Sequence, residues 1–234
     1  MQVKICGITT LDDALAAIDA GADLLGFNFY PRSPRYIEPA ACAALVNRLR
    51  GRGERATLVG VFVNIAADAV SACLDACNLD YAQLHGDEPP EELAALGPWA
   101  FKAIRPANTE EAKRQALRYL PPAPDGYDTL VADPPRPAFL LDAAAPGQFG
   151  GSGQVADWDM ARVLARRWPI LLAGGLRPNN VAAAVETVHP WGVDVATGVE
   201  SSPGRKDIAK MRAFVEAARA NERINESTLP PQDG

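Results

Sequence analysis

Short apolar segments recur eight times along this chain of 234 residues, and Ala-rich stretches with helical periodicity lie between most of them. Short runs of this kind, rich in β-branched and aromatic residues, are typical of strands. Strands that alternate with helices pair in parallel, because a parallel pair needs a long crossover connection. The sequence therefore predicts an α/β protein with eight strands, at residues 3–6, 24–29, 57–63, 81–85, 100–104, 138–142, 170–174 and 193–197.

Eight such units in one chain of this length favour a single (β/α)8 TIM barrel over a doubly wound open sheet. We expect the barrel to span residues 1–224, and the polar residues 225–234 to form a disordered tail. In the first helical stretch, Thr10 or Asp12 is expected to cap the N-terminus, and Gly21 to end the helix. The sequence shows no second domain.

Side-chain parity separates the two candidate folds. Lys4 and Cys6 occupy one face of the first predicted strand, because successive side chains point to opposite faces. In an open parallel sheet helices cover both faces, which read as apolar, whereas a barrel can hold polar groups where its strands end. The pattern favours the barrel, and it predicts that Lys4 pairs with a carboxylate on the neighbouring eighth strand, since each would otherwise be an unpaired buried charge. The further polar residues on this parity are Gln83, His85, Asp142 and Asp194, the last being the predicted partner of Lys4.

The composition restricts the class of partner. With 23 Lys and Arg against 29 Asp and Glu, the chain has a formal net charge of −6, which argues against binding to nucleic acid or to an acidic membrane surface. The four cysteines show neither a disulfide framework nor metal-ligand spacing, and Cys73 and Cys77 are interpreted as core thiols on one helical face. The sequence has no secretory signal and no apolar stretch of membrane-spanning length, so we expect a reduced, cytoplasmic protein without a metal site.

Two clusters of small residues follow the last two predicted strands. Gly174 and Gly175 come where the seventh strand ends and its loop begins, and Thr197 and Gly198 do so after the eighth. Glycines let the backbone approach a ligand closely, and barrels often bind phosphate with the loops after strands seven and eight. The two clusters together predict a phosphate site, although each alone is also typical of an ordinary turn.

Other polar residues are candidates for contact with a ligand. Arg35 lies in a proline-fixed loop after the second strand and is the better candidate to bind a carboxylate or phosphate, whereas Arg32 fits a solvated loop equally well. Asp142 ends the sixth strand, where it could transfer a proton or only cap the following loop. His85 ends the fourth strand, and for this residue a structural or substrate-orienting role is favoured over catalysis.

Motifs distributed over nearly the whole chain resemble those of the phosphoribosylanthranilate isomerase family, in the same order. Glycine clusters alone would fit any phosphate-binding barrel, but "KICGIT" together with "QLHG" and "GVDV-x-x-GVE" is specific to that family. The matching runs are "KICGIT", "GADLLGFNFYPRSPRYI", "VGVFVN", "QLHGDE", "FLLDA", "FGGSG", "LAGGLRPNNV" and "GVDVATGVESSPGRKD".

The resemblance implies a barrel that needs no cofactor and converts N-(5-phosphoribosyl)anthranilate into 1-(2-carboxyphenylamino)-1-deoxyribulose 5-phosphate, an Amadori rearrangement in tryptophan biosynthesis. Carried over by position, it implies that Cys6 is the general base, Asp142 the general acid and Arg35 the ligand of the anthranilate carboxylate. Lys4, on the same face as Cys6, is expected to favour the thiolate. The predicted phosphate and other substrate-binding residues are Gly174, Gly175, Thr197, Gly198, His85 and Asp194.

Two other functions stay open. The analogous isomerase of histidine biosynthesis has an aspartate at the end of strand one, so Cys6 argues against that activity. A non-catalytic phosphate-binding barrel is disfavoured because every residue of the implied catalytic set is present. The chain departs from the family pattern in the Pro-rich stretch 121–137 and at Gln154, where lysine is expected. A monomer and a homodimer are both compatible with the sequence.

Overall fold

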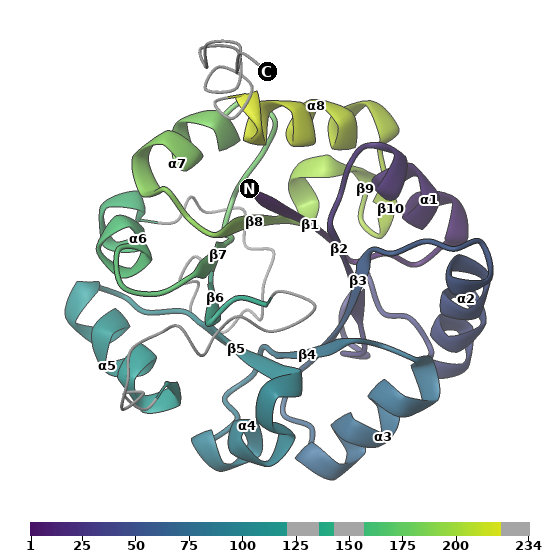
Figure 1. Cartoon of the computed structure of the whole chain (residues 1–234), viewed down its shortest axis with the longest axis horizontal. Coiled ribbons are helices and arrows are strands. Elements are labelled where there is room, and N and C mark those ends of the chain that lie inside the picture. Colours follow the sequence, from purple (N-terminus) through teal and green to yellow (C-terminus); the bar gives the residue numbers. More distant parts are fainter. Residues whose placement is uncertain (121–135, 143–156, 221–234) are drawn as a thin grey trace, which may run out of the picture.

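The computed structural model describes residues 1–120, 136–142 and 157–220. In this part of the chain, eight parallel strands form one closed barrel in the order β1 to β8 (Figure 1). β1 pairs with β2 on one side and with β8 on the other, which closes the sheet. The predicted (β/α)8 barrel is confirmed. The strands are β1 (Gln2–Cys6), β2 (Leu24–Asn28), β3 (Thr57–Phe62), β4 (Tyr81–Leu84), β5 (Ala100–Ile104), β6 (Phe139–Leu141), β7 (Ile170–Leu172) and β8 (Gly192–Val195).

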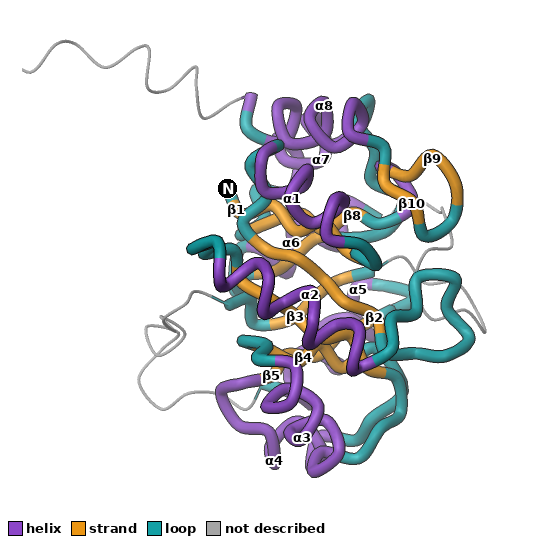
Figure 2. Tube along the Cα trace, turned by 90° about the vertical axis from the view of Figure 1, so that its right-hand side faces the viewer, coloured by secondary structure: helices purple, strands orange, loops and turns teal. Residues whose placement is uncertain are grey.

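The α-helices lie outside the barrel and surround it (Figure 1). After β8 the chain forms a short 3-10 helix, η3 (Thr197–Val199), and a hairpin of β9 (Glu200–Ser202) and β10 (Arg205–Lys206). Figure 2 shows this hairpin at the opposite end of the barrel from the N-terminus. The helices are α1 (Leu11–Asp19), α2 (Pro39–Gly51), α3 (Ala67–Cys77), α4 (Pro90–Leu96), η1 (Gly97–Trp99), α5 (Thr109–Tyr119), α6 (Trp158–Ala165), α7 (Val181–Val188) and α8 (Ile208–Ala218).

Side-chain caps fix the starts of several helices. At α1 the Thr10 hydroxyl accepts a hydrogen bond from the Asp13 amide at 3.1 Å, so Thr10 rather than Asp12 is the cap. Gly21 follows α1 with φ of +97°, a conformation that glycine adopts without strain. Each N-terminal side-chain cap of the Thr10 kind stabilises its helix by about 1 kcal/mol. The same arrangement begins α5, α6 and α8, at Asn108, Asp157 and Asp207.

Two apolar cores result from the alternation of side chains along the strands. The larger core packs the outer face of the barrel against the helices, and it includes Phe139 and Leu141 of β6. Leu140, between them, belongs instead to the inner core. This separation confirms the parity argument, because a strand shifted by one residue would exchange its two faces. The inner core comprises Leu24, Val59, Tyr81, Phe101, Ala103, Leu140, Leu171 and Ala173.

Several strands end earlier than the sequence suggested. β7 stops at Leu172, whereas the prediction extended it to Gly174. The backbone of Gly174 and Gly175 has φ of +95° and +67°, which is incompatible with an extended strand. His85 and Asp142 likewise follow the last residues of β4 and β6. Gly174, Gly175, His85 and Asp142 therefore lie at the rim of the barrel rather than inside the sheet.

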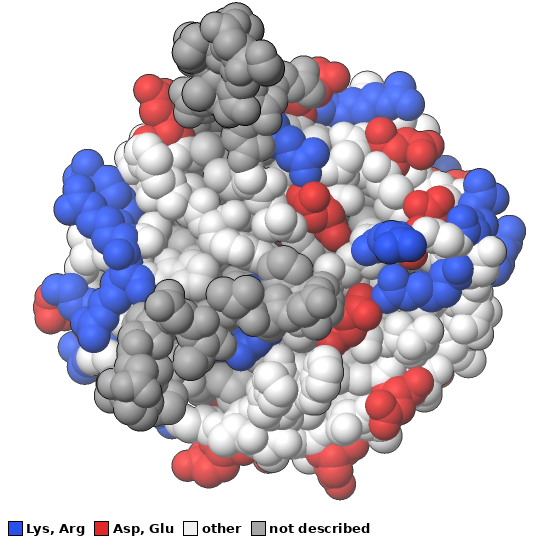
Figure 3. Space-filling view, in the orientation of Figure 1, with Lys and Arg blue, Asp and Glu red and all other residues white. Residues whose placement is uncertain are grey.

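The surface seen in Figure 3 carries acidic and basic side chains around its rim, and neither sign covers that face. In the described ranges, none of the helices has the length and apolar character needed to cross a bilayer. Three predictions lie outside the described residues: the tail at 225–234, the role of Gln154, and most of the Pro-rich stretch, at 121–135.

Candidate active site

One pocket opens where the strands end, at the same end of the barrel as the β9–β10 hairpin. Every site residue predicted from the sequence lines it, whereas Arg32 is exposed and lies outside it. The structure thus brings together residues from both halves of the chain, while their individual roles stay predictions. The predicted residues in the lining are Cys6, Arg35, His85, Asp142, Gly174, Gly175, Asp194, Thr197 and Gly198.

A buried ion pair lies beneath one side of the pocket. Lys4 and Asp194 are register partners on β1 and β8, and the Lys4 Nζ lies 2.8 Å from Asp194 Oδ1. This contact confirms the predicted pairing. Burial alone would lower the pKa of Lys4, but the neighbouring Asp194 and Cys6 outweigh it and the pKa is raised. Lys4 is therefore a permanent positive charge at neutral pH.

The Cys6 thiol faces the same small space as the Lys4 ammonium, and Gly26 on β2 makes that space available. A Cβ on Gly26 would lie 2.8 Å from Cys6 Sγ and 3.0 Å from Lys4 Nζ, so any larger residue there would displace one of them. Burial raises the pKa of Cys6; Lys4 and Lys206 lower it, and Asp194 raises it. The net shift is upward. The expected effect of Lys4 thus has the right sign, but burial outweighs it.

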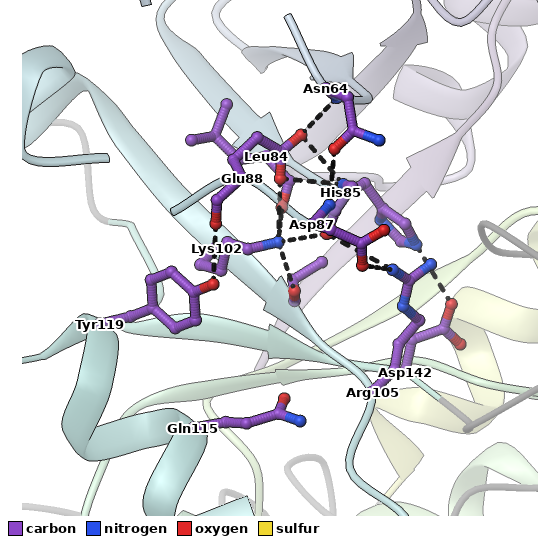
Figure 4. Close-up of polar contacts among 12 residues, drawn as sticks. Asn64, Leu84, His85, Asp87, Glu88, Lys102, Arg105, Gln115, Tyr119 and Asp142 are labelled. Atoms are coloured by element: carbon purple, nitrogen blue, oxygen red, sulfur yellow. Dashed lines mark hydrogen bonds and ion pairs between the residues drawn. The ribbon is translucent and has the colours of Figure 1, made fainter. Parts of the chain in front are cut away.

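Another side of the pocket holds Asp142 and His85, after β6 and β4. The His85 Nε2 lies 3.4 Å from Asp142 Oδ2, and its Nδ1 lies 2.7 Å from Gln83 Nε2. With the Gln83 amide donating to Nδ1, a neutral imidazole carries its proton on Nε2, toward Asp142. Figure 4 shows the ring directed at that carboxyl group. The structural or substrate-orienting role of His85 stays a prediction, and this placement is compatible with it.

Backbone of the last two βα loops forms a further side of the pocket. Gly174 and Gly175 turn the chain away from β7, and Thr197 and Gly198 begin η3 directly after β8. A side chain on Gly198 would collide with the carbonyl oxygen of Leu176, so the two loops touch there. Closely packed loops of this kind present backbone amides to an anion.

Arg35 reaches this pocket from the loop after β2 in a fixed orientation. Its Nε and Nη2 donate to Glu200 Oε1 and Oε2, both at 2.7 Å, and Nη2 also lies 3.3 Å from Thr197 Oγ1. Its aliphatic part packs on Gly7, where a Cβ would lie 2.6 Å from Arg35 Cδ. Lys206 Nζ completes the cluster, 3.0 Å from Glu200 Oε1.

Sequence reasoning missed Glu200 and Lys206, although both stand in the last matching run. They lie in a hairpin rather than in a barrel strand, so strand parity gave no signal. It also missed Lys102 of β5, which faces outward (Figure 4). There Nζ lies 3.0 Å from Glu88 Oε2 and donates to the carbonyl oxygens of Leu84, Gly86 and Ala103.

No cluster of three metal-ligating side chains is found within residues 1–120, 136–142 and 157–220. Cys73 and Cys77 have their sulfur atoms 4.0 Å apart on α3, as expected for thiols on one helical face. Burial raises the pKa of Cys73 to about 12, so this thiol stays protonated at neutral pH.

A closed (β/α)8 barrel with a thiol, a carboxyl group and two glycine loops around one pocket defines the class of barrel enzymes that transfer protons on small anionic substrates. The family model described as N-(5'-phosphoribosyl)anthranilate (PRA) isomerase matches residues 3–217. The chain belongs to this family.

Individual relatives agree with this assignment. The N-(5'-phosphoribosyl)anthranilate isomerase of Myxococcus xanthus is 47% identical over 221 residues, covering 94% of this chain and 97% of that protein. A crystal structure of monomers generated from the dimeric phosphoribosylanthranilate isomerase of Thermotoga maritima is 33% identical, with a TM-score of 0.76 and coverage of 94% and 99%. A structure of phosphoribosyl anthranilate isomerase in complex with reduced 1-(o-carboxyphenylamino)-1-deoxyribulose 5-phosphate is 31% identical, with a TM-score of 0.75 and the same coverage.

Proposed function

We propose that this chain is the isomerase of tryptophan biosynthesis that converts N-(5-phosphoribosyl)anthranilate into 1-(2-carboxyphenylamino)-1-deoxyribulose 5-phosphate. Membership of the family and coverage of 97% of the Myxococcus xanthus relative support the assignment. The observation that carries it is that a thiol, a carboxyl group and a guanidinium group, those of Cys6, Asp142 and Arg35, line one pocket. These are the groups that the reaction needs at its two reacting centres and at the anthranilate carboxylate.

The first proton transfer opens the ribose ring. Asp142, in its protonated form, donates to the ring oxygen as the bond between that oxygen and C1′ breaks, and the nitrogen lone pair forms a C1′=N double bond. His85 presents Nε2 to the same carboxyl group at 3.4 Å, so it orients Asp142 without taking part in the transfer. The nitrogen of the substrate serves as the internal electron sink.

The second proton transfer takes the proton from C2′. Cys6, as the thiolate, removes it, and the electron pair moves to give an enolamine that tautomerises to the ketone. The base sits on β1 and the acid follows β6, so they approach the substrate from different parts of the rim. Holding the reacting atoms between two such groups contributes several kcal/mol to the rate.

The two anionic ends of the substrate fix its position. Arg35 binds the anthranilate carboxylate, and the backbone of Gly174, Gly175, Thr197 and Gly198 binds the phosphate. Asp194 contributes indirectly to the binding of substrate through its ion pair with Lys4.

The substrate is fluorescent, so loss of its fluorescence on addition of purified protein tests the proposal. A parallel reaction with the phosphoribosyl substrate of histidine biosynthesis separates the two Amadori activities. Turnover of the anthranilate substrate is expected. Turnover of the histidine-pathway substrate alone, or of neither, would contradict the proposed function.

We propose a cytoplasmic location, supported by the four free thiols at Cys6, Cys42, Cys73 and Cys77.

We propose a homodimer as the assembly, because the Thermotoga maritima relative is described as dimeric. Light scattering on the purified chain measures the mass directly, and a monomer would contradict the proposed homodimer.

A further inference from the structure

The Glu200 carboxylate is an enclosed charged group beside the pocket, in contact with Arg35 of its lining. Its side chain is 3% exposed, and Lys206, which contacts it, is fully enclosed. Burial acts to raise the pKa of Glu200, but the hydrogen bonds from Arg35 and Lys206 outweigh it and the pKa is lowered. Glu200 is therefore ionised and accepts hydrogen bonds from both cations. Removing either cation would leave this buried carboxylate less well compensated, at a cost in stability.

Lys206 connects this cluster to the strand that carries the base. Its Nζ donates to the Cys6 carbonyl oxygen at 2.6 Å and lies 3.3 Å from the carbonyl oxygen of Ala196. One ammonium thus joins the ends of β1 and β8 to the β9–β10 hairpin. The carboxylate that holds Arg35 is consequently fixed relative to the backbone of Cys6.

The contact with Glu200 uses only one edge of the Arg35 guanidinium. A guanidinium offers two planar edges to a carboxylate, one formed by Nε with Nη2 and the other by Nη1 with Nη2. Glu200 occupies the first edge. Among the residues that the structure describes, no hydrogen bond to Nη1 is found, and Arg35 lines the pocket. Because Nη2 also lies 3.3 Å from Thr197 Oγ1, the Nη1 end of the second edge is the part that is available to a ligand carboxylate.

We propose that Glu200 is a positioning residue that acts through Arg35 and sets the preference of the site for a substrate bearing a carboxylate on its aromatic ring. The inference rests on the proposed function, because it concerns the same site and the same substrate. Without Glu200, Arg35 keeps its charge but loses its orientation. The ligand carboxylate then contributes less to the affinity of the site.

The test compares two ligands that differ only in that carboxylate. They are reduced 1-(o-carboxyphenylamino)-1-deoxyribulose 5-phosphate and its phenylamino counterpart, and calorimetry gives the Kd of each. The wild type is expected to prefer the first ligand. In Glu200→Gln the ratio of the two Kd values is expected to fall about tenfold, the range for a charge-assisted hydrogen bond. Only the Kd of the carboxylated ligand should change. Glu216→Gln, the same change at an exposed position of α8, leaves the ratio unchanged.

A double-variant cycle shows whether Glu200 acts through Arg35. In an Arg35→Ala background, Glu200→Gln is expected to change the ratio no further. Equal weakening of both ligands in Glu200→Gln, or a second tenfold loss of preference in the Arg35→Ala background, would overturn the inference. In steady state, Glu200→Gln is expected to raise KM for the anthranilate substrate about tenfold and to change kcat less than threefold; a loss confined to kcat would also overturn it.

If Glu200→Gln does not fold, Glu200→Asp keeps the charge on a shorter side chain. A smaller loss of preference is then expected, and an unchanged ratio in this folded variant would overturn the inference. Turnover by the wild type tests the proposed function separately. Absence of turnover with an intact binding preference would contradict only the proposed function. Absence of binding by either ligand would contradict the proposed function and the role of Glu200.

Discussion

The base and the acid of the proposed site lie in surroundings built in opposite ways. Around Cys6 the neighbours are charged and paired, with Lys4 bound to Asp194 and Lys206 bound to the carbonyl oxygen of Cys6 itself. Beside Asp142, His85 Nε2 lies 3.4 Å from the carboxyl group without forming a hydrogen bond, and His85 Nδ1 is hydrogen-bonded to the Gln83 amide. The base side therefore belongs to the framework of the barrel, whereas the acid side is arranged by local side-chain contacts.

This difference separates stability from chemistry. A change in the charged pair beside the base, Lys4 with Asp194, disturbs buried charges, so it affects folding as well as activity. A change near the acid disturbs only local side-chain contacts, so we expect it to affect activity with less effect on folding. Variants on each side test this difference when both turnover and the free energy of unfolding are measured.

Cys6→Ala has the largest expected effect. Loss of the base is expected to lower kcat by about 10²–10⁴-fold, the usual contribution of a general base, with little change in the fold because only Sγ is removed. Steady-state kinetics and thermal unfolding measure the two quantities. Cys73→Ala, on α3 away from the pocket, is the matched control and should keep full turnover. Near-wild-type turnover in Cys6→Ala would exclude Cys6 as the base.

Asp142→Asn is expected to lower kcat by about 10²-fold or more, because the amide cannot donate the proton that opens the ring. The free energy of unfolding should change less than in variants of the base side. Kinetics and denaturant titration on the same preparation test both statements. Asp159→Asn, an exposed change on α6, is the control. A large loss of stability with intact turnover would reverse the contrast between the two sides.

Arg35→Ala is expected to act mainly on KM, raising it by about 10–100-fold, because the side chain contacts the remote carboxylate rather than the reacting atoms. The values of kcat and KM, measured separately, give the result. A fall in kcat at unchanged KM would place Arg35 in the chemical step instead.

Lys4→Met is expected to have the smallest effect on activity at its optimal pH but a large one on stability. Removing one partner of a buried pair leaves Asp194 without its counter-ion, at a cost of about 3–5 kcal/mol. Lys4 lowers the pKa of Cys6. Because the thiolate is the active form, kcat/KM rises with pH through that pKa, and loss of Lys4 moves the rise to higher pH.

Lys102→Met is the matched control for this prediction. Lys102 also pairs with a buried carboxylate, that of Glu88, but it lies on the outer face of β5. The Lys102→Met variant should lose stability while the dependence of its kcat/KM on pH stays that of the wild type. A stable but inactive Lys4→Met variant would contradict the structural role assigned to Lys4.

Much of this architecture could be predicted from local periodicity. Alternation along a strand placed Lys4 and Cys6 on the inner face and Leu140 opposite Phe139, because parity depends only on the backbone of that strand. The pairing of Lys4 with Asp194 followed from closure of the barrel. The glycines after β7 were recognised by their residue type and their place after an apolar run, and the structure gives both a positive φ.

The contacts of Glu200 could not be predicted in the same way. They join residues 165 positions apart through a hairpin whose fold no strand pattern encodes. Lys102 was missed because a lysine on the outer face is stabilised by carbonyl oxygens that the sequence does not specify. The net upward shift of the Cys6 pKa depends on burial, which the pattern of residues does not measure.

The hydrogen bond from Lys206 to Cys6 has a consequence for how the protein comes to be active. Its two ends lie 200 positions apart, and the ends of the neighbouring Lys4–Asp194 contact lie 190 apart. During synthesis, the thiol leaves the ribosome long before the groups that surround it. No nascent fragment that lacks the final quarter of the chain can assemble this surrounding, so the Cys6 thiol acquires its environment only as the last unit docks against the first.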